Sequence, residues 1–270
     1  MRNAISAACA AAFLGAGAPA LGAEQGIWGL GTGIHYSSGD YGTSQTTTIG
    51  SIPFTARYDR GPWTFKGSIP WLEVSGPATV IPGVGVVNNT NPRGRGRSGG
   101  GATTTTTTGT ASGIGDLVLS ATYAAHYDRA SELGIDLTGK VKVPTADEDK
   151  GLGTGETDYA AIVEAYKTID RLTLLGGIGR HFLGSSTFIP LNDVWSGSLG
   201  ASYRVDDRDS AGLTFDARQR VSPSAFPQRE LTAFWSRKLD RGWKGQAYVL
   251  KGFADGSPDW GAGLSVVRSL

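Results

Sequence analysis

The feature that most constrains the fold is an alternation of apolar and polar side chains that recurs in twelve segments between Gly26 and Leu270. A period of two residues is the pattern of a β-strand with one apolar and one polar face. The predicted strands are residues 27–37, 46–58, 62–73, 114–127, 132–143, 157–168, 171–182, 194–204, 210–220, 229–239, 242–253 and 259–269. The alternation therefore predicts an all-β fold.

The connections between these strands alternate in length. Those after even strands are brief turns, such as Asp59-Arg60-Gly61-Pro62, whereas those after odd strands are mostly longer. Bacterial outer-membrane barrels have an even number of antiparallel strands, with short periplasmic turns and longer external loops. We therefore predict an antiparallel transmembrane β-barrel of about 12 strands, with both chain termini at the periplasmic end.

A soluble β-sandwich would show the same period, so the placement of the aromatic residues has to separate the two folds. Aromatic residues gather at the two ends of the predicted strands, as they do at the two membrane interfaces of a barrel. The turn-end belt contains Trp28, Trp63 and Trp243 with Tyr58, Tyr127 and Tyr203, and the loop-end belt contains Trp71, Trp195 and Trp260 with Tyr36, Tyr159 and Phe182. Trp235 alone falls nearer the middle of a strand. The two belts favour a membrane barrel.

The first 23 residues read as a secretory signal peptide, with Arg2 before an apolar run and small residues around cleavage sites after Ala20 or Ala23. Export to the bacterial outer membrane is the expected outcome, and residues 24–270 would form the barrel. The single cysteine, Cys9, lies inside this leader and lacks the leucine expected three residues before a lipidated cysteine. Disulfides and thiol catalysis are therefore excluded from the mature chain.

Residues 74–113 are predicted to form a long flexible loop that carries two low-complexity stretches. Arg93, Arg95 and Arg97 precede a threonine run, Thr103 to Thr108. The favoured interpretation is a mobile extracellular loop. The alternative is that the arginines contact lipopolysaccharide phosphates or fold into the mouth and bias it toward anions. The formal net charge of the whole chain is only +1, so composition offers no argument for nucleic-acid binding.

Three candidate chemical sites are weak. Residues 151–155, Gly-Leu-Gly-Thr-Gly, lack the helix and the full spacing of a phosphate-binding loop. The carboxylates between Asp147 and Asp158 do not have the spacing of a calcium loop, so no metal or cofactor is predicted. His35 and Ser37 share a strand face, which raises the hypothesis of a lipid-modifying enzyme, but their neighbours on the opposite face are apolar and place both side chains in the lumen. We predict no enzymatic activity.

The inward-facing charges are the candidate functional residues, because charges that line a pore set its width and ion preference. They are Arg57, Lys66, Asp136, Lys140, Lys142, Glu164, Asp216, Arg218, Lys238 and Lys244. About half of them would serve only to pair with opposite charges inside the barrel. The mixture of signs argues against strong selectivity.

The middle of the chain resembles a known family. The residues that carry the resemblance are Gly113-Ile114-Gly115-Asp116-Leu117, Tyr123, the run Lys142 to Asp147, and Gly151 to Gly155 with Asp158-Tyr159. Together they are similar to the outer-membrane barrel family associated with the meta-pathway of phenol degradation. The resemblance covers residues 113–182 and implies a channel for aromatic or other hydrophobic small molecules. Ala146 stands where a glycine is expected, and the chain ends in Leu270 rather than in a terminal aromatic.

We therefore predict an outer-membrane channel for passive uptake of small solutes. The alternatives are a barrel plugged by its own side chains, with a structural or surface-binding role, and a lipid-modifying barrel enzyme. The expected partners are outer-membrane lipid and lipopolysaccharide, a small-molecule solute and the outer-membrane assembly machinery, with no nucleic acid.

Overall fold

A computed structural model of the protein describes residues 26–91 and 108–270. The predicted signal peptide and the loop arginines Arg93, Arg95 and Arg97 lie outside the described residues. Within the described part of the chain, no helix is long and apolar enough to cross a membrane. The only helical element there is the short 3-10 turn η1 (Asp240–Gly242).

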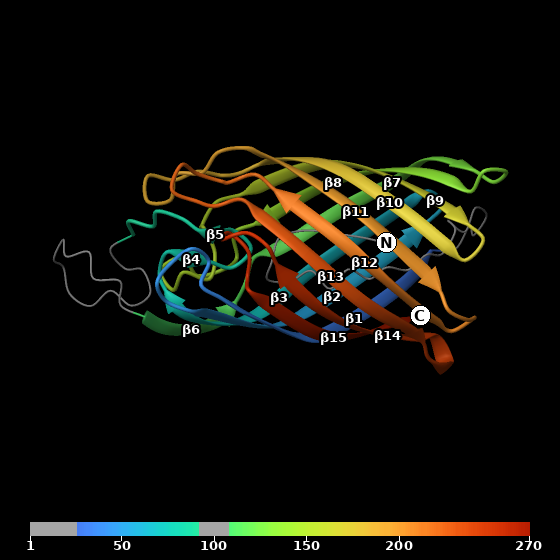
Figure 1. Ribbon diagram of the computed structural model, residues 1–270, viewed down its shortest axis with the longest axis horizontal. Coiled ribbons are helices and arrows are strands. Elements are labelled where there is room, and N and C mark those ends of the chain that lie inside the picture. The colour runs from blue at the N-terminus through green and yellow to red at the C-terminus, as the bar shows by residue number, and fades with distance from the viewer. Residues whose placement is uncertain (1–25, 92–107) are drawn as a thin grey trace.

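The strands form one closed antiparallel sheet, as predicted (Figure 1). Each wall strand except β6 pairs with a neighbour on both sides, and the β2–β3 and β1–β15 pairings close the ring. The wall strands of the described residues are β1 (Ile27–Gly39), β2 (Thr47–Arg60), β3 (Trp63–Pro77), β6 (Thr108–Ile114), β7 (Leu117–Asp128), β8 (Leu133–Val143), β9 (Asp158–Ile169), β10 (Leu172–Phe182), β11 (Val194–Arg204), β12 (Asp209–Arg218), β13 (Gln228–Lys238), β14 (Trp243–Gly252) and β15 (Trp260–Ser269).

Strands β6 and β7 count as one interrupted strand of the barrel, because both pair with β3 and only Gly115 and Asp116 separate them. Counted in this way, the described strands make a twelve-stranded barrel, which confirms the predicted fold class. Short connections gather at one end, here called the turn end, and long connections at the other, here called the loop end. β1 begins and β15 ends at the turn end, where Gly29 lies opposite Ser269.

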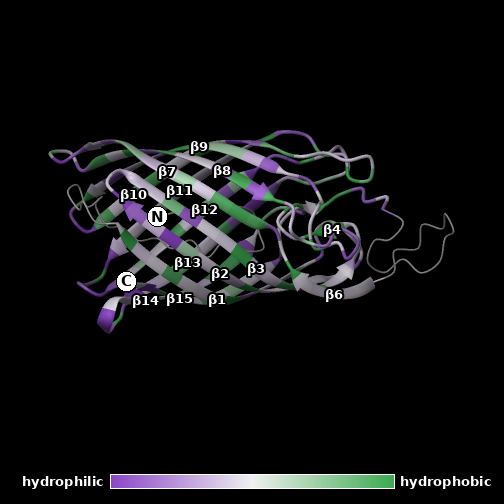
Figure 2. Ribbon diagram, turned by 180° about the vertical axis from the view of Figure 1, so that it is seen from behind, coloured by the Kyte–Doolittle hydropathy of each residue, from purple (hydrophilic) through white to green (hydrophobic). Residues whose placement is uncertain are grey.

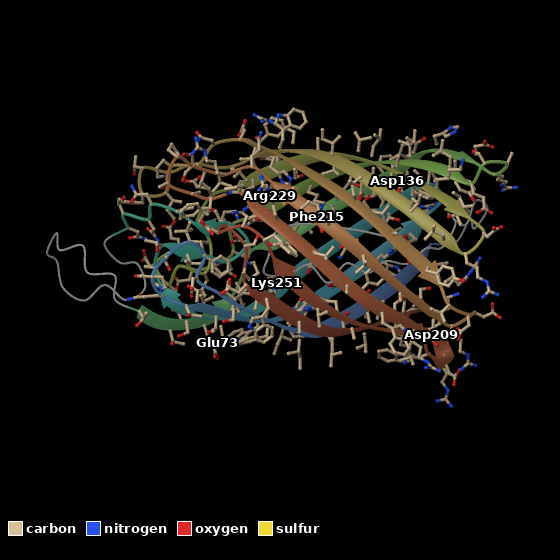
Figure 3. All side chains as sticks on the ribbon, in the orientation of Figure 1. Glu73, Asp136, Asp209, Phe215, Arg229 and Lys251 are labelled. Atoms are coloured by element: carbon tan, nitrogen blue, oxygen red, sulfur yellow. The ribbon has the colours of Figure 1, made fainter. Side chains whose placement is uncertain are left out.

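The two faces of the wall follow the predicted alternation, and Figure 2 shows apolar and polar residues alternating along the strands. Large hydrophobic side chains such as Leu30, Ile34, Leu199, Phe215 and Leu264 are exposed on the outside. Figure 3 shows the side chains on both faces, with Phe215 and Asp136 labelled. An apolar exterior around a polar interior is the arrangement that a lipid bilayer requires of a barrel.

The tryptophans predicted to form the two interface belts, Trp28, Trp63, Trp71, Trp195, Trp243 and Trp260, are all exposed on the outer face, as is Trp235. Several pair with an aromatic ring on a neighbouring strand, including Trp28 with Tyr58 at 4.7 Å and Trp63 with Tyr123 at 4.8 Å between ring centroids. The indole N–H of Trp235 donates a hydrogen bond of 2.9 Å to Asp209. This contact gives the polar edge of the least regularly placed tryptophan a partner on the outer face.

Two residues of β7 differ from the predicted alternation. A β-bulge between Ala124 and His126 shifts the register with β8, so that His126 pairs with Ile135 and Tyr127 with Gly134. The extra residue of a bulge reverses the side-chain alternation beyond it. His126 is therefore exposed on the outer face, and Tyr127 leaves the predicted turn-end belt for the inner face.

The segment predicted as a flexible loop from 74 to 113 is more regular at its ends and in its first half. β3 runs on to Pro77 and β6 begins at Thr108, while β4 (Val80–Ile81) and β5 (Gly85–Val86) form a small hairpin. Val80 and Ile81 are almost completely buried, and the hairpin lies at the loop end of the barrel (Figure 1). The apolar side chains of residues 78–91 gain more from burial in the mouth than from exposure to water.

Glycines on the inner face accommodate large rings from the next strand. The directly opposed pairs are Gly134 with Tyr166, Gly212 with Phe234 and Gly263 with Tyr248. A Cβ at Gly212 would lie only 2.4 Å from the Phe234 ring and 2.5 Å from the carbonyl oxygen of Ala201. Cross-strand coverage of glycine by an aromatic ring pins the register of neighbouring strands.

We expect Gly212→Ala to destabilise the barrel by about 1–3 kcal/mol, because the added methyl group overpacks the inner face. Gly139→Ala on β8 is the matched control, since a Cβ there meets nothing within 4 Å. The control should be neutral or slightly stabilising, as alanine restricts the unfolded chain more than glycine does. Equal urea-unfolding midpoints for the two variants would contradict this account.

Candidate functional site: the barrel lumen

The ten charges predicted to line the lumen all lie at inward positions of the alternation. Nine are buried or half-buried inside the barrel, and Lys238 is exposed at the turn end, opposite Lys244. The inner face carries four further carboxylates that the sequence analysis did not select: Asp59, Asp116, Asp158 and Glu230. Glu230 lies on the same face of β13 as Lys238. Asp158 likewise lies on the same face of β9 as Glu164, so the alternation alone would have identified both carboxylates as inward-facing. The structure divides these charges into three levels.

The first level, at the turn end, is basic. Arg57 on β2 lies opposite Lys66 on β3, and Lys244 on β14 lies within electrostatic range of Arg57. We call Arg57, Lys66 and Lys244 the basic collar. Arg57 is partly neutralised, because its guanidinium donates hydrogen bonds of 2.7 to 3.0 Å to both carboxylate oxygens of Asp59. Thr64 donates a further hydrogen bond to Asp59 and fixes that carboxylate.

The second level is a cavity of about 60 Å³ inside the barrel. It is lined by charged, polar and apolar residues of β8 to β14. The charged ones are Lys140, Glu164, Asp216, Arg218 and Glu230, and the others include His181, Ser196, Gln228, Ile162 and Leu250. We call this space the central cavity. It combines acidic and basic side chains with apolar surface, which suits a small amphipathic solute better than a purely apolar one.

His181 lines the central cavity and lies 2.8 Å from the Ser196 hydroxyl through its Nε2 atom. The sequence analysis missed this pair because the two residues come from neighbouring strands. A histidine and a serine at this distance resemble two parts of a catalytic triad. Among the described residues no carboxylate contacts the imidazole, and the charges in electrostatic range, Arg218 and Lys140, are basic. The pair lacks the acidic residue that would orient a catalytic base.

The third level, at the loop end, holds the β4–β5 hairpin. The Arg218 guanidinium donates hydrogen bonds of 3.1 and 2.7 Å to the carbonyl oxygens of Gly83 and Val84. Two apolar clusters pack around the hairpin. One contains Tyr41, Ile49, Leu72, Val74, Val80, Ala146 and Leu152, and the other contains Ile81, Val87, Ile189, Leu191, Val194, Val221 and Ala225. Inward strand residues and loop residues thus narrow the mouth together.

The three sequence stretches that carry the family resemblance converge on one cluster beside this mouth. The Lys142 ammonium lies 2.8 Å from Asp158 and 3.4 Å from Asp116, and it donates a hydrogen bond of 2.9 Å to the Thr154 hydroxyl. Asp116 also accepts the backbone N–H of Ala146 at 3.0 Å. We call Asp116, Lys142, Thr154 and Asp158 the loop clamp. It ties residues 144–157 to the break between β6 and β7.

The loop clamp changes the interpretation of Lys142. Its charge is taken up by two carboxylates, so it stabilises a loop rather than facing the lumen as an unpaired cation. Ala146, where the family resemblance predicts glycine, is accommodated by Gly153, at which a Cβ would come within 2.8 Å of the Ala146 Cβ. The glycine-rich stretch 151–155 is therefore a packed loop, with Leu152 buried in the mouth.

The remaining candidates are His35 with Ser37 and the groups that could hold a metal ion. His35 and Ser37 are buried on the inner face, as predicted, and the Nδ1 atom of His35 lies 3.0 Å from the Tyr248 hydroxyl. Within residues 26–91 and 108–270, no group of histidine, cysteine, aspartate or glutamate is arranged to hold a metal ion. A lipid-modifying site at His35 would need access from the outer face, which its inward side chain does not have.

We expect Lys142→Met to loosen residues 144–157, because it leaves Asp116 and Asp158 as two neighbouring, largely buried carboxylates without their cation. Loss of one partner from a buried ion pair costs about 3 kcal/mol or more. Tryptic cleavage after the exposed Lys150 should therefore accelerate about tenfold or more, since cleavage follows the population of the open loop. Lys238→Met, at the exposed turn end, should leave the rate unchanged. Equal cleavage rates for the two variants would show that the clamp does not hold the loop.

No protein-family model and no curated protein sequence matches the chain. Among solved structures, the KdgM porin is similar with a TM-score of 0.52 and 11% sequence identity, over 90% of this chain and 99% of that chain. The KdgM porin in complex with disordered oligogalacturonate gives a TM-score of 0.51 at 9% identity, over the same shares of the two chains. At this identity the likeness concerns the fold, and the protein has the architecture of an outer-membrane porin barrel.

Proposed function

We propose that the protein is an outer-membrane channel through which small solutes pass passively. The observation that carries the proposal is the central cavity, a space lined by charged and apolar side chains inside a barrel whose outer face is apolar. A barrel that only needed to be stable could fill its interior with paired or apolar side chains. Charges that line an enclosed space instead meet whatever enters it. The porin-like fold supports the same function.

The proposed solute is small and carries polar groups. The family resemblance implies an aromatic or other hydrophobic compound, and Ile162 and Leu250 supply apolar surface in the central cavity. Lys140, Glu164 and Glu230 in the same cavity would disfavour a solute without polar groups, because entry would strip their remaining hydration without replacing it. We therefore propose a solute with an apolar body and charged or hydrogen-bonding ends.

The proposed setting of the channel follows the predicted targeting. Residues 1–23 would be removed during export, and the exposed hydrophobic belt would contact outer-membrane lipid and lipopolysaccharide after insertion by the assembly machinery. The unmutated protein should therefore be found in the outer-membrane fraction of cells that express it. It should also migrate differently on a denaturing gel before and after boiling. Recovery in the soluble periplasmic fraction would refute the membrane proposal.

A second candidate function, a plugged barrel without conductance, is favoured by the two apolar clusters at the loop end. There the β4–β5 hairpin and residues 144–157 occupy the mouth. In a channel, these same segments would set the narrowest width on the external side. The two functions differ in one measurable property, the current through a single barrel.

We expect the purified protein to give discrete conductance steps in a planar bilayer. Replacement of residues 79–88 by a glycine-serine linker should raise the unit conductance, because it removes the hairpin and its buried apolar side chains from the mouth. Lys150→Gln, in an exposed part of another loop, should leave the unit conductance unchanged. If only the protein with the linker conducts, the natural barrel is plugged. If neither protein conducts, the channel proposal fails.

A further inference from the structure

Lys140 is a cation of the central cavity whose ammonium group makes no hydrogen bond within the described residues. Its side chain projects from β8 and the residue is only 6% exposed, yet its Nζ atom has no hydrogen-bond partner among the described residues. Arg218, the other cation of the cavity, donates through its Nη atoms to the carbonyl groups of Gly83 and Val84, and Glu230 lies within electrostatic range of it. Its Nε atom has no hydrogen-bond partner among the described residues. A buried ammonium group without a hydrogen-bond acceptor is costly, and an acceptor brought by a ligand would remove that cost.

Three carboxylates face the same cavity from the neighbouring part of the wall. Glu164 on β9, Asp216 on β12 and Glu230 on β13 line the space, and Glu164 and Glu230 are less than a tenth exposed. Asp216 lies within electrostatic range of both Glu164 and Glu230. The Oε1 atom of Glu230 has no hydrogen-bond donor among the described residues. The acidic part of the cavity therefore has capacity for a cationic donor.

The arrangement discriminates between classes of ligand. A simple anion at Lys140 would add a negative charge beside Glu164 and Asp216, which both lie within electrostatic range of that ammonium. A simple cation at Asp216 would in turn lie within range of Lys140. A ligand with one charge of each sign satisfies both parts at once, because each of its ends meets the opposite charge.

The size and remaining lining of the cavity limit the ligand further. A volume of about 60 Å³ holds about four to six water molecules at roughly 10–15 Å³ each, which is the space of a ligand with few heavy atoms. Ile162 and Leu250 offer apolar surface for a short hydrocarbon segment between the charged ends.

We infer that the central cavity binds a small zwitterion, whose carboxylate accepts hydrogen bonds from Lys140 and whose ammonium group donates to Asp216 and Glu230. The inference rests on the proposed function, since it names the class of solute that the channel would pass. It identifies Lys140 as the residue that determines specificity for the carboxylate. Glu230, which the sequence analysis did not select, has the corresponding role for the ammonium group.

Calorimetric titration of the purified barrel in detergent micelles tests the inference without requiring conduction. The probes are the unbranched ω-amino acids from glycine to 6-aminohexanoate, with butanoate and butylammonium as the single-charge analogues of 4-aminobutanoate. The best ω-amino acid should bind about tenfold or more tightly than either analogue, because each charge-assisted hydrogen bond contributes about a tenfold factor or more. Butanoate or butylammonium binding as tightly as every ω-amino acid would overturn the inference, as would the absence of any zwitterion binding.

Variants of Lys140 and Glu230 test which of these residues binds which charged end of the ligand. Lys140→Gln should weaken zwitterion binding about tenfold or more, and Lys140→Arg should restore most of it, because arginine keeps the charge and the donors. Glu230→Gln should weaken the zwitterion without weakening butanoate. Lys251→Gln, on the exposed outer face of β14, is the matched control and should bind like the unmutated protein. Equal zwitterion affinity in Lys140→Gln and Lys251→Gln would overturn the assignment of Lys140.

The outcomes distinguish a failure of the zwitterion-binding inference from a failure of the channel proposal. Heat-dependent gel migration checks that each variant has folded. If a variant does not fold, the analogue series on the unmutated protein still decides the inference. A barrel that binds zwitterions but never conducts retains the site and refutes the channel. A barrel that conducts but binds no zwitterion retains the channel and refutes the inference.

Discussion

The structure depends first on the requirement that every backbone N–H and C=O group inside a bilayer finds a partner within the protein. An open sheet would leave two unpaired edges in the hydrocarbon, so the wall has to close. Closure comes from the pairing of β1 with β15, which runs from Gly29 opposite Ser269 to Ser38 opposite Trp260. Once the ring is closed, each strand has one face toward lipid and one toward the lumen. The alternation then places apolar side chains on the lipid face and polar side chains on the lumen face.

The closed ring also explains how charges reach the interior of a membrane protein. Lys140 and Glu164 are buried from solvent by the barrel wall and by the loops, while the glycines opposite Tyr166, Phe234 and Tyr248 provide space for large rings in the same interior. The loop end is different, because apolar loop residues fill it and Arg218 anchors the hairpin there. The lumen thus changes from a basic collar through a mixed-charge cavity to an apolar mouth.

The fold class, the strand count and the orientation of nearly every strand could be predicted because they depend on local alternation and on loop length. The inward position of His35 and of the ten candidate charges could be predicted for the same reason. The alternation failed at Tyr127 and His126, because the bulge in β7 depends on pairing with β8 and leaves no clear local signal. The alternation also could not show that Lys142 contacts Asp116 and Asp158, since the three residues come from different strands or the segments between them.

The sequence by itself determined that this chain forms an even-numbered antiparallel barrel with an apolar outer belt and a charged interior, because the period of two residues and the spacing of the turns are local properties. Only the tertiary structure decided which interior charges are already neutralised and which face the central cavity. Arg57 is paired with Asp59, and Lys142 is paired with the carboxylates of the loop clamp. The Lys140 ammonium group has no hydrogen-bond partner in the described part of the chain. The physical reason is that hydrogen bonds and ion pairs in the lumen join residues from different strands and loops, and their distances exist only after the ring has closed.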